Sequence, residues 1–184
     1  MTFRLADSLP REKREQIEAQ REAWMHSKGL ASLDQIELLT EDDRKEYHRI
    51  FTAKIHELLG AGYGSCTLKD QANIVTSALL FFDGDRCDVL SFVVMPNHVH
   101  VLVCPIPPHS LSEILHSWKR FTAREINKRL GVMGALWLDE NFDHIVRSET
   151  QFEHFRNYIR DNSSKARLPT GSYLHYDKES GTGL

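Results

Sequence analysis

The sequence predicts an α+β sandwich in which an antiparallel sheet packs against helices. Two observations lead to this class. Strand-like and helix-like patterns follow one another in the order strand, helices, strand, strand, helix, strand, helix. The two central strand-like segments are separated only by the turn signal Pro96-Asn97, which favours an antiparallel hairpin. The chain has 184 residues, enough to bury a core, and we expect one domain over residues 1–168.

The N-terminal part predicts a strand followed by two charged helices. The stretch "TFRLADSL" alternates apolar and polar side chains, as a half-buried strand does. Pro10 and Gly29 bracket the first helix, and Thr40 and Gly60 bracket the second. We interpret this helical pair, residues 10–62, as an insertion into the α+β domain.

The remaining elements follow from hydrophobic periodicity and from helix start and stop signals. The best-defined helix begins at the capping box Ser110/Glu113 and ends before Gly131, and a second capping box, Ser148/Gln151, begins the last helix. The predicted elements are a helix over 69–85, strands over 86–95 and 98–105, a helix over 110–131, a strand over 142–148 and a helix over 148–166. Residues 169–184 are rich in Gly and Ser, and we expect a flexible tail.

Composition narrows the class of protein. The three cysteines show no CxxC spacing, which argues against a disulfide framework and a zinc ribbon and favours a cytoplasmic protein. No segment approaches the roughly 20 apolar residues of a membrane span, so we expect no membrane association. The net charge of −3 gives no overall signal for nucleic-acid binding, although a local basic patch could still provide it.

Two histidines interrupt the aliphatic run "VVMPNHVHVLV". In a strand, His98 and His100 would point to the same face about 7 Å apart at Cα, while Val99 and Val101 would point to the other. Neutral imidazoles at this spacing can bind one metal ion. Half-buried histidines that donate to carbonyl groups are the alternative, and the spacing alone favours it.

The last helix supplies possible partners for this pair. Tyr158 and Asn162 are four residues apart and share one helix face, beside the apolar stripe of Phe152, Phe155 and Ile159. An amide oxygen at this position could be a third metal ligand, and a phenol one turn away could be a nucleophile. The alternative for Tyr158 is a tyrosine at the edge of the core with a hydrogen-bonded hydroxyl.

Taken together, these segments resemble the REP-associated tyrosine transposases of the single-tyrosine HUH superfamily. The resemblance is spread over most of the chain and is carried by "TFRLADSLP", "GSCTLKD", "VVMPNHVHVLV", "SLSEILHSWKRFTAREIN", "LWLDENFDHIVRSE" and "FRNYIRDN". It implies a ferredoxin-like core, with the histidine strand central in the sheet and the tyrosine helix lying across it. Where members of the family commonly have Asn-Pro, this chain has Asn162-Ser163.

The resemblance also implies a site and an activity. His98, His100 and Asn162 would hold a divalent ion, Mg²⁺ or Mn²⁺, and Tyr158 would be the nucleophile. The activity would be cleavage and rejoining of single-stranded DNA beside palindromic, REP-like hairpins through a 5′-phosphotyrosine intermediate, by a monomer or a homodimer. Two alternatives stay open: a domesticated protein that binds palindromic DNA without cleaving it, and a nickase related to relaxases and replication initiators.

Basic side chains in the C-terminal half suggest a DNA-binding surface. Residues 110–168 contain ten basic and eight acidic side chains, a net charge of +2 in a chain that totals −3. Some of these cations recur at helical spacing, and for each of them a solvated helix face is an equally good interpretation. The candidates for DNA contact are Arg120, Arg124, Lys128, Arg147, Arg160 and Lys165.

Overall fold

A computed structural model of the chain describes residues 1–8, 10–31, 35–36, 39–52 and 64–178. These residues divide into two compact units, one formed by Met1–Ala6 with Ser65–Leu184 and the other by Asp7–Gly64. The first unit is the α+β domain, and it contains all the candidate site residues. The interpretation of residues 10–62 as an insertion into a single domain stays a prediction.

The α+β unit is built on one antiparallel sheet with the strand order β4-β1-β3-β2-β5 among the described residues. Its first four strands, with a helical connection between β1 and β2 and another between β3 and β4, have the ferredoxin-like arrangement that the sequence predicted. The elements of this unit are β1 (Thr2–Leu5), the 3₁₀ turn η3 (Thr67–Lys69), α4 (Ala72–Leu80), β2 (Cys87–Val94), β3 (His98–Pro105), α5 (Leu111–Leu130), β4 (Trp137–Phe142), α6 (Glu149–Lys165) and β5 (Leu174–Asp177).

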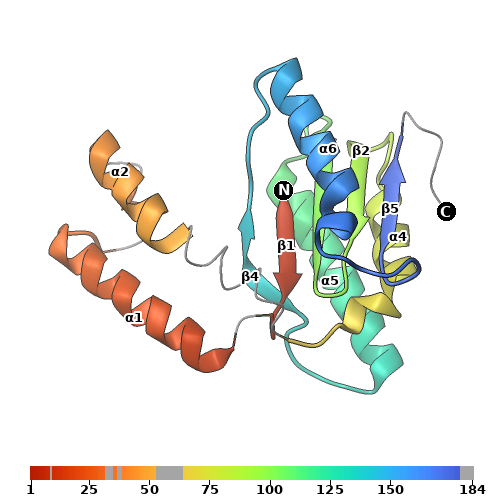
Figure 1. Ribbon diagram of the computed structural model, residues 1–184, viewed down its shortest axis with the longest axis horizontal. Coiled ribbons are helices and arrows are strands. Elements are labelled where there is room, and N and C mark those ends of the chain that lie inside the picture. Colours follow the sequence, from red (N-terminus) through yellow and green to blue (C-terminus); the bar gives the residue numbers. More distant parts are fainter. Residues whose placement is uncertain (9, 32–34, 37–38, 53–63, 179–184) are drawn as a thin grey trace. The chain divides into compact units, whose positions relative to one another are not determined.

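Helices cover both faces of this sheet (Figure 1). On one face, α4 and α5 pack on the main core, in which Val99 and Val101 of β3 are fully buried beside Trp118 of α5. On the other face, α6 packs through Ile159 on a smaller cluster that includes Leu102 of β3. The alternation predicted for β3 is therefore confirmed. One face of this central strand packs into the main core, and the α6 face carries the histidines.

Local sequence signals account for the helix boundaries of this unit. The predicted capping box of α5 is present, with the Ser110 hydroxyl and the Glu113 carboxylate each accepting from the other residue's backbone N–H. Gly131 ends α5 in the left-handed conformation, at φ 68°. Ser148 caps α6, which continues past Asn162 to Lys165, because Ser163 does not end a helix as proline would.

One prediction of strand position and one of helix length were wrong. The strand expected over 142–148 lies at Trp137–Phe142 instead, where the Trp137 ring packs against Phe3 and its Nε1 donates to Thr122. Ile145, which lies within the stretch expected to form a strand, is 69% exposed. The helix expected over 69–85 is also shorter than predicted, because α4 occupies only Ala72–Leu80.

The segment from residue 169 was expected to be a flexible tail, but its described part, residues 169–178, adds an edge strand. Residues 179–184 lie outside the described residues. β5 pairs with β2 over Leu174–Asp177, and Asp177 is 4% exposed. Arg156 of α6 donates to both carboxylate oxygens of Asp177, at 2.8 and 2.7 Å. A buried bidentate pair of this kind fixes β5 against α6, which the turn-rich composition of the segment did not indicate.

This ion pair gives a first test of the fold. We expect Asp177→Asn to lower the free energy of unfolding by about 2 kcal/mol, because it leaves a largely buried guanidinium with a neutral partner. Urea unfolding measures the change. Asp161→Asn is the matched control: its pair with Arg160 is exposed, so it should change stability by less than about 0.5 kcal/mol. Equal effects of the two substitutions would contradict the docking role of Asp177.

The other unit contains α1 (Arg11–Ser27), α2 (Glu41–Tyr47) and the π-helical turn η2 (His48–Thr52). Trp24 packs against Tyr47 and Phe51, with ring centroids 5.5 and 6.1 Å apart. Lys28 forms salt bridges to Asp43 and Glu46. The predicted second helix therefore begins as expected, and its part over 53–62 lies outside the described residues.

Candidate functional site

The histidine strand brings two imidazoles together under α6. The ring centroids of His98 and His100 are 4.7 Å apart with an interplanar angle of 80°. His98, His100 and Leu102 follow one another at intervals of two residues along β3, so their side chains lie on the same face of the sheet. This is the α6 face, because Leu102 belongs to the cluster on which α6 packs. His100 is buried, at 5% exposure, and β3 is flanked by β1 and β2, so the pair sits in the middle of the sheet.

His98 is held in its neutral form. Burial and, to a smaller extent, the nearby Arg4 guanidinium lower the pKa of His98 to about 3, although a hydrogen bond with the Asn162 side chain acts in the opposite direction. Nδ1 of His98 lies 2.7 Å from Oδ1 of Asn97. Because a carbonyl oxygen can only accept, Nδ1 is the donor in this bond and Nε2 carries the lone pair. A neutral imidazole with a lone pair on one nitrogen is the form that binds metal ions.

His100 is oriented by a residue of the first strand. Thr2 of β1 pairs with His100 of β3, and Oγ1 of Thr2 lies 2.7 Å from Nδ1 of His100. A hydrogen bond at one imidazole nitrogen fixes the ring and determines which nitrogen is available to a ligand. This partner could not be predicted from local patterns, because pairing of β1 with β3 is a contact between residues 98 positions apart.

Tyr158 and Asn162 complete the cluster from α6. The Tyr158 ring lies against His100, with centroids 5.2 Å apart, and Asn162 hydrogen bonds to His98. The Tyr158 side chain is 39% exposed, so its phenol is open to solvent and to a ligand. Nζ of Lys165, one helical turn beyond Asn162, lies 5.5 Å from the Tyr158 ring centroid. The four residues that the sequence singled out for catalysis and metal binding therefore lie together in space.

The donor set suits a divalent ion. Two imidazoles and one amide oxygen provide mixed nitrogen and oxygen ligands without a carboxylate, so a bound ion would keep open positions for phosphate or water. In the described part of the chain, no cluster of three or more His, Cys, Asp or Glu side chains could hold a metal. The candidate site therefore depends on Asn162, which supplies the third ligand from α6.

The state of His98 predicts how stability depends on pH. His98 has a folded-state pKa far below the unfolded value of about 6.5, so the unfolded chain binds its proton first as the pH falls. Stability is therefore complete above pH 6.5 and decreases toward pH 3. Between pH 7.5 and pH 5 we expect wild type to lose about 2 kcal/mol more than His98→Gln, measured by urea unfolding with EDTA present. Identical pH dependence of the two proteins would contradict a half-buried, neutral His98.

The candidate DNA-binding residues fall into two groups. Arg160 and Lys165 belong to α6, the helix that carries Tyr158, and Arg147 lies exposed just before that helix. Arg120, Arg124 and Lys128 belong to α5, which covers the opposite face of the sheet. The structure thus brings only the first group to the histidine side.

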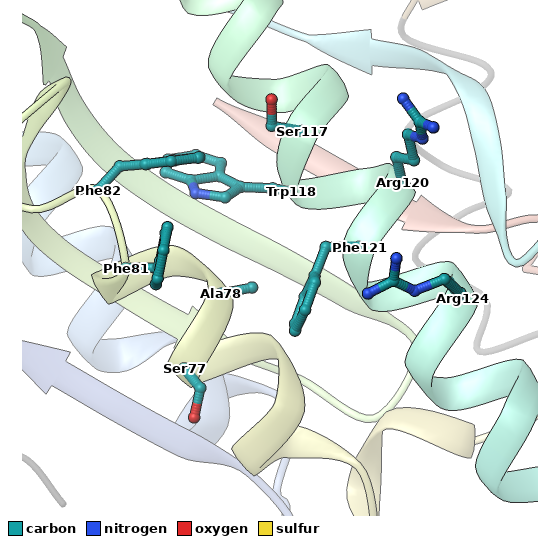
Figure 2. A pocket seen from close by; sticks show the side chains of 9 residues that line it. All are labelled: Ser77, Ala78, Phe81, Phe82, Ser117, Trp118, Arg120, Phe121 and Arg124. Carbon is teal, nitrogen blue, oxygen red and sulfur yellow. The ribbon is translucent and has the colours of Figure 1, made fainter.

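The α5 group borders a pocket between α4 and α5. Arg120 and Arg124 line this cavity of about 400 Å³ together with Phe81 and Phe121 (Figure 2). The two aromatic side chains are 77% and 42% exposed, and the Arg124 guanidinium lies 5.6 Å from the Phe121 ring centroid. Lys128 lines a neighbouring hollow that Phe121 also borders.

Fold and site together define a class of protein with a histidine pair in a ferredoxin-like sheet and a tyrosine helix across it. The model of the IS200-like transposase family matches residues 43–162, a region of 120 residues that includes all four clustered side chains. The chain belongs to the IS200-like transposase family.

A solved structure, described as a REP-associated tyrosine transposase bound to a REP hairpin, is similar to this chain with 22% sequence identity and a TM-score of 0.47. The similarity covers 55% of this chain and 60% of that protein, so less than two thirds of its length is matched. Comparison with curated proteins gave no significant match. Among the described residues, no helix has the length and apolar character to cross a membrane.

Proposed function

We propose that this protein is a metal-dependent endonuclease and strand transferase that acts on single-stranded DNA beside palindromic, REP-like hairpins. The observation that carries the proposal is the convergence of Tyr158 with His98, His100 and Asn162, from strand β3 and helix α6. Tyr158 is the nucleophile in this account, and the other three are metal ligands. The proposed location is the cytoplasm, and the proposed oligomeric state is a monomer or a homodimer.

The reaction is an exchange of one phosphate ester for another. The Tyr158 oxygen attacks the phosphorus of a DNA phosphodiester and loses its proton, while the bond to the 3′ oxygen breaks and that oxygen gains a proton. The products are a 5′-phosphotyrosine and a free 3′-OH. Because the ester bond is conserved, a 3′-OH can reverse the step and join strands without ATP.

The side chains around Tyr158 fit the charges in this reaction. A divalent ion, Mg²⁺ or Mn²⁺, held by His98, His100 and Asn162 would neutralise negative charge on the phosphate oxygens. The neutral state of His98 allows such binding without competition from a proton at physiological pH. Lys165 adds a positive charge beside the Tyr158 ring.

The proposal is tested by looking for the covalent intermediate. Labelled single-stranded hairpin DNA is incubated with the protein and Mn²⁺, and the products are separated under denaturing conditions. We expect a protein–DNA band that disappears when EDTA replaces Mn²⁺. If wild type forms no band with any divalent ion but still binds the hairpin, the binding-only alternative is correct and strand transfer is excluded.

The basic side chains predict a specific salt dependence. Each phosphate contact to single-stranded DNA contributes about −0.7 to the slope of log K against log salt concentration. Replacing Arg160 and Lys165 of α6 with Gln should therefore weaken binding and flatten the slope by as much as about 1.4. Fluorescence anisotropy in a salt series measures both quantities.

The α5 group is tested in the same experiment, with Gln at Arg120, Arg124 and Lys128. The matched control is Lys13→Gln with Lys45→Gln, two substitutions in the helical unit of residues 7–64. A slope that changes for the control but not for either basic group would contradict the assignment of DNA contacts to α5 and α6.

A further inference from the structure

Arg4 is a buried cation in the first strand, beside the candidate site. β1 pairs with β3 so that Arg4 lies opposite His98, just as Thr2 lies opposite His100. Thr2 and Arg4 are two residues apart and share the α6 face, whereas Phe3 and Leu5 point into the main core. Arg4 is only 7% exposed, and it lies outside the region that matches the family model.

The guanidinium of Arg4 lacks the partners that a buried cation needs. Its Nε and Nη1 atoms are buried and have no hydrogen-bond partner among the residues that the structure describes. Arg156 shows the contrasting case, because its guanidinium is matched by the buried carboxylate of Asp177 through two hydrogen bonds. A fork of N–H donors without an acceptor is an arrangement that a bound planar or tetrahedral anion would complete.

The surroundings of Arg4 contain the reacting groups of the proposed function. Its positive charge contributes to lowering the pKa of His98, and the Tyr158 phenol has an electrostatic effect that raises the pKa of Arg4. The group that would arrive between Arg4, His98 and Tyr158 during the proposed reaction is a DNA phosphate, which carries the negative charge that is lacking there.

We propose that Arg4 binds the non-bridging oxygens of the DNA phosphate that Tyr158 attacks. This inference rests on the proposed function and adds to it a phosphate-binding residue from β1. In the free protein the donors of Arg4 are already in place, so they need little reorganisation when negative charge develops on the phosphate. Arginine suits this position better than lysine because its fork can donate two parallel hydrogen bonds to one phosphate.

Phosphate binding by Arg4 can be measured without any metal or cleavage. The probe is inorganic phosphate, added in EDTA at low ionic strength to protein labelled with ¹⁵N, and the readout is the arginine Nε–Hε signal that is missing from Arg4→Lys. We expect this signal to shift with phosphate and to stay in place with chloride at the same ionic strength. A signal that does not respond to phosphate would overturn the proposal.

Substitutions separate binding of phosphate from a structural role. We expect Arg4→Met to unfold at the same temperature as wild type or a higher one, because the variant removes a buried charge without a partner. The same variant should form the covalent Tyr158–DNA adduct about 100-fold more slowly in single-turnover experiments, the effect of removing one preorganised donor. Arg4→Lys should recover only part of this rate. A loss of thermal stability in Arg4→Met with an unchanged adduct rate would show a structural residue instead.

The controls keep the two proposals distinguishable. Arg129→Gln removes an exposed arginine at the end of α5 and should change neither the phosphate response of Arg4 nor the adduct rate. If wild type forms no adduct, strand transfer fails, while the Nε–Hε titration still decides whether Arg4 binds phosphate. If the adduct forms equally fast in wild type and Arg4→Met, strand transfer stands and the role of Arg4 is refuted.

Discussion

Tyr158→Phe is expected to abolish the covalent protein–DNA adduct while the protein stays folded and still binds DNA. The substitution removes only the oxygen that would form the phosphate ester, so the adduct should fall by more than about 10³-fold, to the limit of detection. Stability should change little, because the Tyr158 side chain is 39% exposed and keeps its ring against His100. Denaturing gels measure the adduct, and anisotropy measures the binding that remains.

Tyr173→Phe is the matched control, since Tyr173 packs at the edge of the same smaller apolar cluster without lying against the histidines. This variant should form the adduct at the wild-type rate. An adduct that persists in Tyr158→Phe and is lost in Tyr173→Phe would move the nucleophile to another residue.

His100→Ala is expected to remove metal binding and the adduct together. Loss of one of three protein ligands should weaken Mn²⁺ binding by more than about 100-fold, as measured by isothermal titration calorimetry. Thr2→Val, which removes the hydrogen bond to Nδ1 of His100, should weaken Mn²⁺ binding by about 10-fold, because it frees the ring without removing the ligand.

The control for this series is His116→Ala, which removes an exposed histidine of α5 and should leave Mn²⁺ binding unchanged. The order of affinities is the decisive result. Wild-type affinity in His100→Ala would contradict the metal site, and an effect of Thr2→Val as large as that of His100→Ala would make Thr2 a ligand itself.

The parts of the fold predicted correctly are those set by local patterns. The alternation of "HVHVLV" put the histidines on one face and the valines on the other, and the structure has both. The stripe of Phe152, Phe155 and Ile159 likewise identified the face on which α6 packs. Spacing of this kind depends only on the period of the strand or the helix, so it can be read from one segment at a time.

The errors concern contacts between distant segments. The position of β4 depends on Trp137, which reaches Thr122 and Phe3, and β5 depends on the ion pair of Arg156 with Asp177. Neither partner is visible from the short strand itself. The same reason hid Thr2 and Arg4, whose relation to the histidines exists only once β1 has paired with β3.

The most direct test of the central claim is to locate the bond between protein and DNA. The adduct formed with single-stranded hairpin DNA and Mn²⁺ is digested with protease and nuclease, and the modified peptide is sequenced by tandem mass spectrometry. The site described above predicts a nucleotide joined through its 5′-phosphate to Tyr158 in the peptide from α6. A nucleotide attached to any other side chain, or joined through its 3′-phosphate, would contradict it.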